Sequence, residues 1–236
     1  LLQPALPAAA LGGLWSEADG QLDPLPLLQA LLLQAESLGA TRLRERVIGL
    51  RRSSAGGWQL QLASGTSLRA SAVVLSAGAG TADLLDNLEP DPALRASQPT
   101  PLQPVLGQAL ELEAAADASA WCWQGDWPAA VVWQGINLVP RPQGRLWLGA
   151  TLEPGNSANP DALSQLAQLN GHAPPWLGGA RVIRHWQGLR LRPVGRPAPW
   201  LEALAPGLLL ACGHYRNGLL LAPATAEWLV EQLEAP

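Results

Sequence analysis

Residues 207–223 read Gly207-Leu-Leu-Leu-Ala-Cys-Gly213-His214-Tyr215-Arg216-Asn217-Gly218-Leu-Leu-Leu-Ala-Pro223. The apolar run 208–211 predicts a buried strand, the two glycines that follow bound a turn, and the next residues predict a helix to about Gln232. Amides at the start of a helix lack partners within it and carry a partial positive charge. The pattern therefore predicts an anion-binding corner between a strand and a helix.

Arg216 adds a guanidinium to this turn. Two ligands would suit it: a small-molecule carboxylate paired with Arg216, or electron-rich cofactor atoms resting against the turn. Glycine-rich corners are common in α/β folds, so Arg216 as the cap of a neighbouring carbonyl is an equally good interpretation of the residues alone.

The amino-acid composition of the chain excludes several classes of function. The chain has 236 residues, 48% of them hydrophobic, and a net charge of −4, which indicates a soluble protein with a sizeable core and no nucleic-acid partner. All 15 basic residues are arginine, which excludes a lysine Schiff base and pyridoxal-phosphate chemistry. The cysteines form no Cys-x-x-Cys motif and the histidines show no metal-ligand spacing, so we expect no metal site.

Two expectations concern location and completeness. No apolar run reaches membrane-spanning length, so we expect no membrane association. We also expect a cytoplasmic protein. The chain has no Met and begins at Leu1, so we expect it to be part of a longer protein.

The first 88 residues predict helices and strands in alternation. A short strand and a turn are expected within 1–19, and Asp23 and Pro24 start a helix that ends at Gly39 and packs its wide apolar face on a sheet. Runs 41–51, 58–63 and 67–70 predict a three-stranded meander. A buried parallel strand at 72–75, a turn of small residues and a helix from 81 follow.

Prolines at 90, 92, 99, 101 and 104 predict a domain boundary. Runs 105–113, 129–139 and 145–151 predict a mostly antiparallel sheet with a hairpin turn at 141–144. A helix at 160–170, ended by Gly171, and a buried strand at 181–187 complete the pattern. The fold class is therefore α/β, or α+β overall, with boundaries near 88 and 186.

Eleven tryptophans stand against no Phe and one Tyr. Exposed indoles stack on sugars or bases, so the cluster Trp121, Trp123, Trp127 and Trp133 could form a ligand-binding surface. In a chain without Phe and Met, tryptophans also fill large core sites, and this interpretation is favoured.

Several motifs together resemble one family. They are Asp19-Gly20-Gln-Leu-Asp23-Pro24, Ala72-Val-Val-Leu-Ser-Ala-Gly78-Ala, Leu138-Val-Pro140-Arg141, Leu148-Gly149-Ala150-Thr151-Leu-Glu153, Trp186-Gln-Gly188-Leu189-Arg190, and the closing Gly213-His214-Tyr215-Arg216-Asn217-Gly218. In this order they resemble the glycine oxidase and D-amino-acid oxidase family of flavoproteins. The resemblance implies a partial FAD-binding Rossmann-like domain with a β-meander (1–88), an antiparallel substrate-binding domain (89–186) and a return segment of the first domain (187–236). The family's first βαβ unit, with its Gly-x-Gly-x-x-Gly turn, is not in the sequence.

The same resemblance implies site residues. FAD would be contacted by Val47, Gly78, Ala79, Gly213, His214, Tyr215, Asn217, Gly218 and Leu219. The substrate carboxylate would be held by Arg190 and Arg216, with Asn137 where the family often has a tyrosine. Leu191 interrupts the family pattern, which leaves Arg192 as the alternative to Arg190. Both predicted arginines could instead form structural ion pairs with Glu153, Glu202 or Asp126.

The reaction implied by the resemblance is oxidative deamination. Glycine or a small amino acid loses a hydride from its α-carbon to FAD, the imine hydrolyses to a keto acid and ammonia, and molecular oxygen becomes hydrogen peroxide. The family also implies a role in thiamine biosynthesis and a homo-oligomer. Two alternatives stay open: a flavoenzyme similar to sarcosine oxidase or D-amino-acid dehydrogenase, and a non-catalytic Trp-rich ligand-binding remnant.

Overall fold

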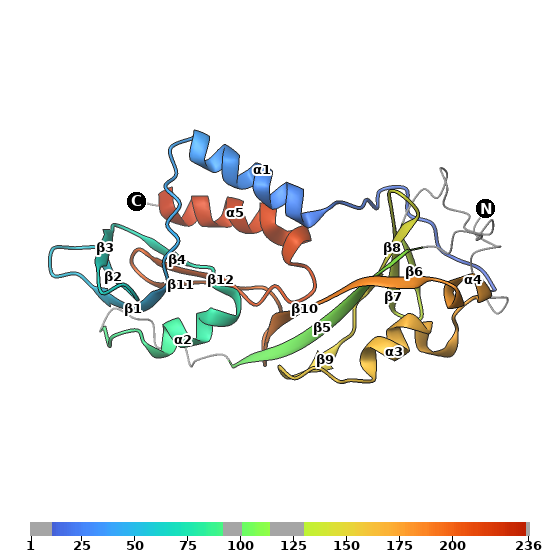
Figure 1. Ribbon diagram of the computed structural model, residues 1–236. Helices are drawn as coiled ribbons and strands as arrows, with labels where there is room; N and C mark the ends of the chain where they lie inside the picture. Colours follow the sequence, from blue (N-terminus) through green and yellow to red (C-terminus); the bar gives the residue numbers. More distant parts are fainter. Residues whose placement is uncertain (1–10, 92–100, 114–129, 235–236) are drawn as a thin grey trace. The chain divides into compact units, whose positions relative to one another are not determined.

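The computed structural model describes residues 11–91, 101–113 and 130–234. Its chain divides into two compact units, whose elements are labelled in Figure 1. The first unit comprises residues 1–41 and 106–188, and the second comprises residues 42–105 and 189–236. The expected α/β class is confirmed.

The second unit begins with the predicted meander. Strands β1 (Val47–Arg52), β2 (Trp58–Leu62) and β3 (Ser67–Ala70) pair antiparallel in that order. Trp58 is fully buried and donates from Nε1 to the carbonyl of Pro206 at 3.2 Å. The first strand starts at residue 47 rather than 41, and its pairing with β2 begins where Val47 lies opposite Leu62.

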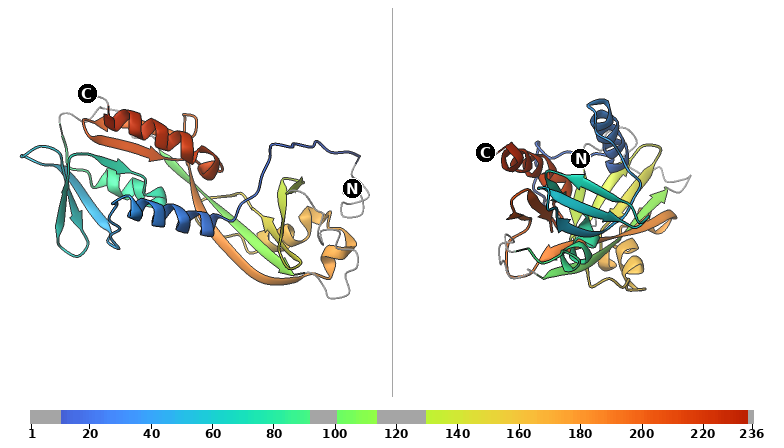
Figure 2. Two further views of the ribbon diagram at one scale, coloured as in Figure 1. Left: turned by 90° about the horizontal axis from the view of Figure 1, so that it is seen from above. Right: turned by 90° about the vertical axis from the view of Figure 1, so that its left-hand side faces the viewer.

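A second sheet of this unit leads into the turn at residues 213–218. Its order is β11 (Trp200–Ala205), β12 (Leu208–Cys212), β4 (Val73–Leu75). The predicted parallel strand is confirmed, because β4 pairs parallel with β12, and every residue of β12 is buried. Helix α5 (Gly218–Glu234) follows the turn and lies along this sheet in Figures 1 and 2. A 3-10 turn, η1 (Gly78–Gly80), and α2 (Thr81–Asp86) follow β4, as expected.

The first unit is built on a larger sheet of order β10-β5-β8-β7-β6, with β9 paired to β5. Its strands are β5 (Leu102–Glu113), β6 (Val131–Trp133), β7 (Ile136–Arg141), β8 (Arg145–Gly149), β9 (Glu153–Pro154) and β10 (Arg181–Pro193). The division between the units falls within β5 and within β10. Leucines such as Leu110, Leu138 and Leu146 form a core with Leu166 and Leu169 from the segment that holds α3 (Ala162–Ala167), η2 (Leu169–Gly171) and α4 (Pro175–Gly178).

Three expectations for this unit were wrong in part. The single strand expected at 129–139 is two strands, because Gln134 (φ +50°) and Gly135 (φ +76°) make a two-residue turn that pairs Trp133 with Ile136. The strand expected at 181–187 extends to Pro193 and is mostly exposed rather than buried. The helix expected at 160–170 is the shorter α3 followed by η2, and Gly171 (φ +84°) does end it.

Helix α1 (Pro24–Ser37) has the predicted ends. Asp23 accepts a hydrogen bond from the backbone N–H of Leu25 at 3.1 Å, and Gly39 adopts φ +96° just after the last turn. The expected packing of its apolar face was wrong: α1 has no buried residue, and all its leucines except the half-buried Leu27 are exposed. The short strand expected before it is also not seen within residues 11–19, where the chain only turns. Among the described residues, no helix is long and apolar enough to cross a membrane.

Candidate functional site

A cavity of about 440 Å³ lies in the second unit at the carboxyl ends of β4 and β12. Its walls also include the start of α5 and the last residues of β10. Most lining residues are small or apolar. Seven of the residues predicted from the sequence line it: Gly78, Ala79, Arg190, Gly213, His214, Tyr215 and Gly218.

The turn after β12 contains two residues with left-handed backbone conformation, Gly213 and Tyr215. Gly213 has φ +64°, and a Cβ atom there would lie 2.8 Å from Cγ of Pro193. Tyr215 is also left-handed, with φ +54°, and its N–H donates to the carbonyl of Leu191 at 3.2 Å. Only glycine fits at the first position without displacing the proline ring, so the sequence of the turn sets the shape of the cavity.

The ring of His214 holds the turn to the helix. Its Nε2 lies 2.9 Å from the hydroxyl oxygen of Thr225, a buried residue about two turns into α5. Burial lowers the pKa of His214, which favours the neutral imidazole at pH 7. The sequence indicated only a backbone role for His214; the partner Thr225 was missed because it becomes a neighbour only when α5 packs on the sheet.

Arg190 lines the cavity, whereas Arg216, which was predicted beside it, is exposed and is not among the lining residues. Arg190 is partly buried there, and burial together with the nearby guanidinium of Arg216 lowers its pKa, while Tyr215 opposes this shift. A guanidinium stays charged under these conditions, so two positive groups lie within electrostatic range of each other. An anion placed near them would relieve this repulsion.

The structure also places the alternative arginine. Arg192 donates from Nη2 to Oε1 of Gln103 at 2.6 Å, and its guanidinium lies 5.9 Å from the ring centre of Tyr215. Arg190 lines the cavity and Arg192 does not.

The acidic residues considered as structural partners have other contacts. Glu153 accepts from the backbone N–H of Asn159 at 2.6 Å, from Gln108 and from Thr151; burial raises its pKa, but these hydrogen bonds outweigh burial and the net shift is downward. Glu202 accepts from Arg196 at 2.9 Å and from Nε1 of Trp200 at 2.7 Å. Asp126 lies outside the described residues.

Other predicted residues lie elsewhere. Val47 lines a different cavity of the second unit, of about 550 Å³, together with residues of β4 and α2. Asn137 belongs to the first unit, where its side-chain amide donates to the carbonyl of Gly149 at 2.9 Å. Asn217 and Leu219 are exposed and do not line the 440 Å³ cavity.

Three of the tryptophans lie in or against the two cores, and one cysteine lines the cavity. Trp58 and Trp200 fill the core of the second unit, and Trp133 packs against the core of the first; Trp121, Trp123 and Trp127 lie outside the described residues. Cys212 lines the cavity, and burial raises the pKa of its thiol to about 11. This position could not be predicted from the sequence, because a lone cysteine in an apolar strand belongs to no motif.

A family model and the similar sequences both indicate a flavin-dependent oxidoreductase. Residues 1–232 match the family described as FAD dependent oxidoreductase. The glycine oxidase of Pseudomonas putida KT2440 is 38% identical over 178 residues, which cover 74% of this chain and 44% of that protein. The bifunctional protein ThiO/ThiG of Synechocystis is 33% identical over 232 residues, which cover 95% of this chain and 32% of that protein.

Solved structures agree. The crystal structure of glycine oxidase from Geobacillus kaustophilus matches with a TM-score of 0.70 and 28% identity, over 88% of this chain and 53% of that one. L-Proline dehydrogenase from P. horikoshii shares the fold, with a TM-score of 0.74 at 18% identity. The chain thus spans about half or less of the length of these relatives. The resemblance seen in its motifs is confirmed, and the chain belongs to the family of FAD-dependent oxidoreductases.

Proposed function

We propose that this chain is part of a glycine oxidase-type enzyme that oxidatively deaminates glycine or another small amino acid. The observation that carries the proposal is the position of Arg190 in the cavity formed by the Gly213–Gly218 turn. A guanidinium binds a carboxylate through two parallel hydrogen bonds, and every amino-acid substrate has a carboxylate.

The cavity fits part of FAD. The space where a Cβ of Gly78 would lie has no heavy atom within 4 Å, Ala79 is small, and the amides at the start of the 17-residue helix α5 face electron-rich ligands favourably. A volume of about 440 Å³ suits a ring system rather than a whole dinucleotide. When bound, FAD would supply the redox chemistry, taking a hydride from the substrate α-carbon and passing electrons to molecular oxygen.

The task of the protein is then to orient the substrate. Arg190 would hold the carboxylate and Arg216 would add a second positive charge, which an anionic group would relieve. The thiol of Cys212 is protonated at neutral pH, and the ring of His214 is engaged by Thr225. These contacts support a site that works through charge and position and supplies neither a nucleophile nor a base from these two residues.

The test uses the full-length protein that contains this chain, because the relatives are about twice as long. We expect the purified protein to show a flavin absorbance band that bleaches when glycine is added without oxygen and returns in air. Arg190→Gln should weaken glycine binding about 100-fold, since it removes two charge-assisted hydrogen bonds. Arg192→Gln is the matched control, and its effect should stay within a few-fold.

Two results would contradict the proposal. One is a folded protein that takes up no FAD. The other is a flavoprotein whose bleaching by glycine is as sensitive in Arg190→Gln as in the wild type.

A further inference from the structure

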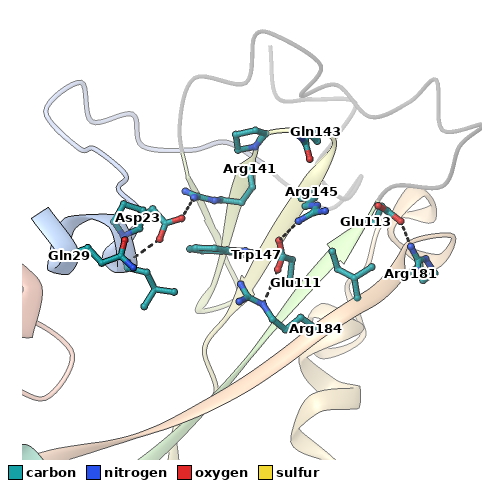
Figure 3. A pocket seen from close by; sticks show the side chains of 14 residues that line it. Asp23, Gln29, Glu111, Glu113, Arg141, Gln143, Arg145, Trp147, Arg181 and Arg184 are labelled. Atoms are coloured by element: carbon teal, nitrogen blue, oxygen red, sulfur yellow. Dashed lines mark hydrogen bonds and ion pairs between the residues drawn. The ribbon is translucent and has the colours of Figure 1, made fainter. Parts of the chain in front are cut away.

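The first unit has a cavity of its own, of about 900 Å³, shown in Figure 3. It lies over β5, β7, β8 and β10 and the start of α1. Four guanidiniums line it, those of Arg141, Arg145, Arg181 and Arg184. Among the described residues, three carboxylates line it with them, which leaves an excess of one positive charge on the described part of the wall. Nothing in the glycine oxidase reaction proposed above requires this cavity.

One side of the cavity is held by a fixed ion pair. Arg141 Nη2 lies 2.6 Å from Oδ2 of Asp23, whose other oxygen caps α1 through the N–H of Leu25. The guanidinium of Arg141 also lies 4.1 Å from the ring centre of Trp147. Because Asp23 and Trp147 both hold Arg141, little side-chain freedom remains to be lost when a ligand binds beside it.

The opposite side shares a carboxylate between two arginines. Glu111 is buried, and its oxygens lie 3.0 Å from Nε of Arg184 and 3.6 Å from Nη1 of Arg145. Each guanidinium has five N–H donors and a carboxylate has about four acceptor positions, so one carboxylate leaves many donors of this pair unused. Figure 3 shows the three side chains gathered beside Trp147.

Two buried donors in this wall have no partner among the described residues: Nε of Arg145 and Nε1 of Trp147. They belong to residues two apart on β8, which therefore point to the same face of the sheet. A buried donor without a partner costs on the order of 1–3 kcal/mol. In the described part of the chain, no side-chain acceptor of the cavity wall is buried without a partner. The unpaired groups of the wall are therefore both donors, and a ligand that pairs with them must offer acceptor atoms.

We propose that this cavity binds a small oxyanion, the carboxylate or phosphate group of a metabolite, with Arg145 and Trp147 as its central contacts. The excess positive charge favours an anion, and the planar guanidinium suits the oxygens of either group. The volume leaves room for several carbon atoms attached to the oxyanion. The cavity is built from residues of the first unit alone, whereas the Arg190 cavity is built from the second.

The test is isothermal titration calorimetry of the full-length protein with succinate and, separately, with inorganic phosphate. We expect one of the two probes to bind, and the probe that binds tells whether the site prefers a carboxylate or a phosphate. Arg145→Gln should weaken binding about tenfold or more, and Trp147→Phe, which keeps an aromatic ring without the donor, should weaken it several-fold. Arg69→Gln, an exposed arginine of β3, is the matched control and should bind as the wild type does.

Binding must also be unchanged in Arg190→Gln, because otherwise the probe occupies the other cavity. The proposal is overturned if neither probe binds to the wild type, if Arg190→Gln removes the binding, or if both Arg145→Gln and Trp147→Phe bind as tightly as Arg69→Gln. Should Arg145→Gln fail to fold, Trp147→Phe and Arg145→Lys decide the question.

Discussion

The cavity that holds Arg190 and the cavity that holds Arg145 have walls of different kinds. In the second unit the wall is mainly backbone and small side chains, with Arg190 as its charged group. In the first unit long charged side chains from several strands form the wall and hold one another by ion pairs. A wall made of backbone is sensitive to any added atom, whereas a wall made of paired charges is sensitive to the loss of one partner.

The largest effect is expected from an added methyl group at Gly213. Gly213→Ala places a Cβ 2.8 Å from Cγ and 3.0 Å from Cδ of Pro193, at a φ of +64°. We expect the free energy of unfolding to fall by about 2–4 kcal/mol, since both backbone strain and overpacking contribute. Urea denaturation measures this.

The matched control is Gly188→Ala in the first unit, where no heavy atom lies within 4 Å of the new Cβ. Its effect should stay within about 0.5 kcal/mol. Equal denaturation midpoints for the two variants would show that the turn is not held as tightly as its geometry indicates.

A smaller effect is expected from removing a charge in the first unit. Glu111→Gln leaves Arg145 and Arg184 without the carboxylate between them. Both guanidiniums are about half exposed, so solvent screening limits the loss of stability to about 1–2 kcal/mol. Glu113→Gln breaks the more exposed pair with Arg181 and should cost less than about 0.5 kcal/mol. Thermal unfolding of the two variants in parallel tests this, and an equal loss in both would contradict it.

The smallest effect concerns the pH dependence of the second unit. Burial lowers the pKa of His214 below its usual value of 6.5, so the unfolded chain binds the proton more readily than the folded one. Stability from this group is therefore present above pH 6.5 and is lost as the pH falls through the window below it. His214→Gln should show a weaker loss of stability between pH 7.5 and pH 5.5 in urea denaturation, and identical pH dependence in both proteins would count against the assignment.

Much of the second unit could be predicted from local patterns. The alternation of Trp58, Leu60 and Leu62 with two glutamines gave the meander, and the apolar run at 208–211 gave a buried strand, because burial on one face or both leaves a period in the sequence. The break at Gln134 and Gly135 was missed, since glutamine is not typical of a left-handed turn position.

The parts of the candidate site that are formed by residues close together in the sequence could be predicted. The parts that depend on how distant elements pack could not. Glycines and small residues next to strand ends indicated the cavity, and their roles toward FAD stay predictions. Contacts such as His214 with Thr225 depend on how α5 meets the sheet. The arginine-rich cavity was not foreseen at all, because Arg145 and Arg184 become neighbours only through the strand order β10-β5-β8.

The parallel pairing of β4 with β12 has a consequence for synthesis on the ribosome. Ser76, just after β4, donates to the carbonyl of Ala211, and the two residues are 135 positions apart. At a translation rate of about 5–20 residues per second, β4 emerges roughly 7–27 s before its partner strand exists. Throughout that interval the nascent chain has an unpaired apolar strand edge, so a chaperone that covers residues 73–75 should raise the yield of folded protein.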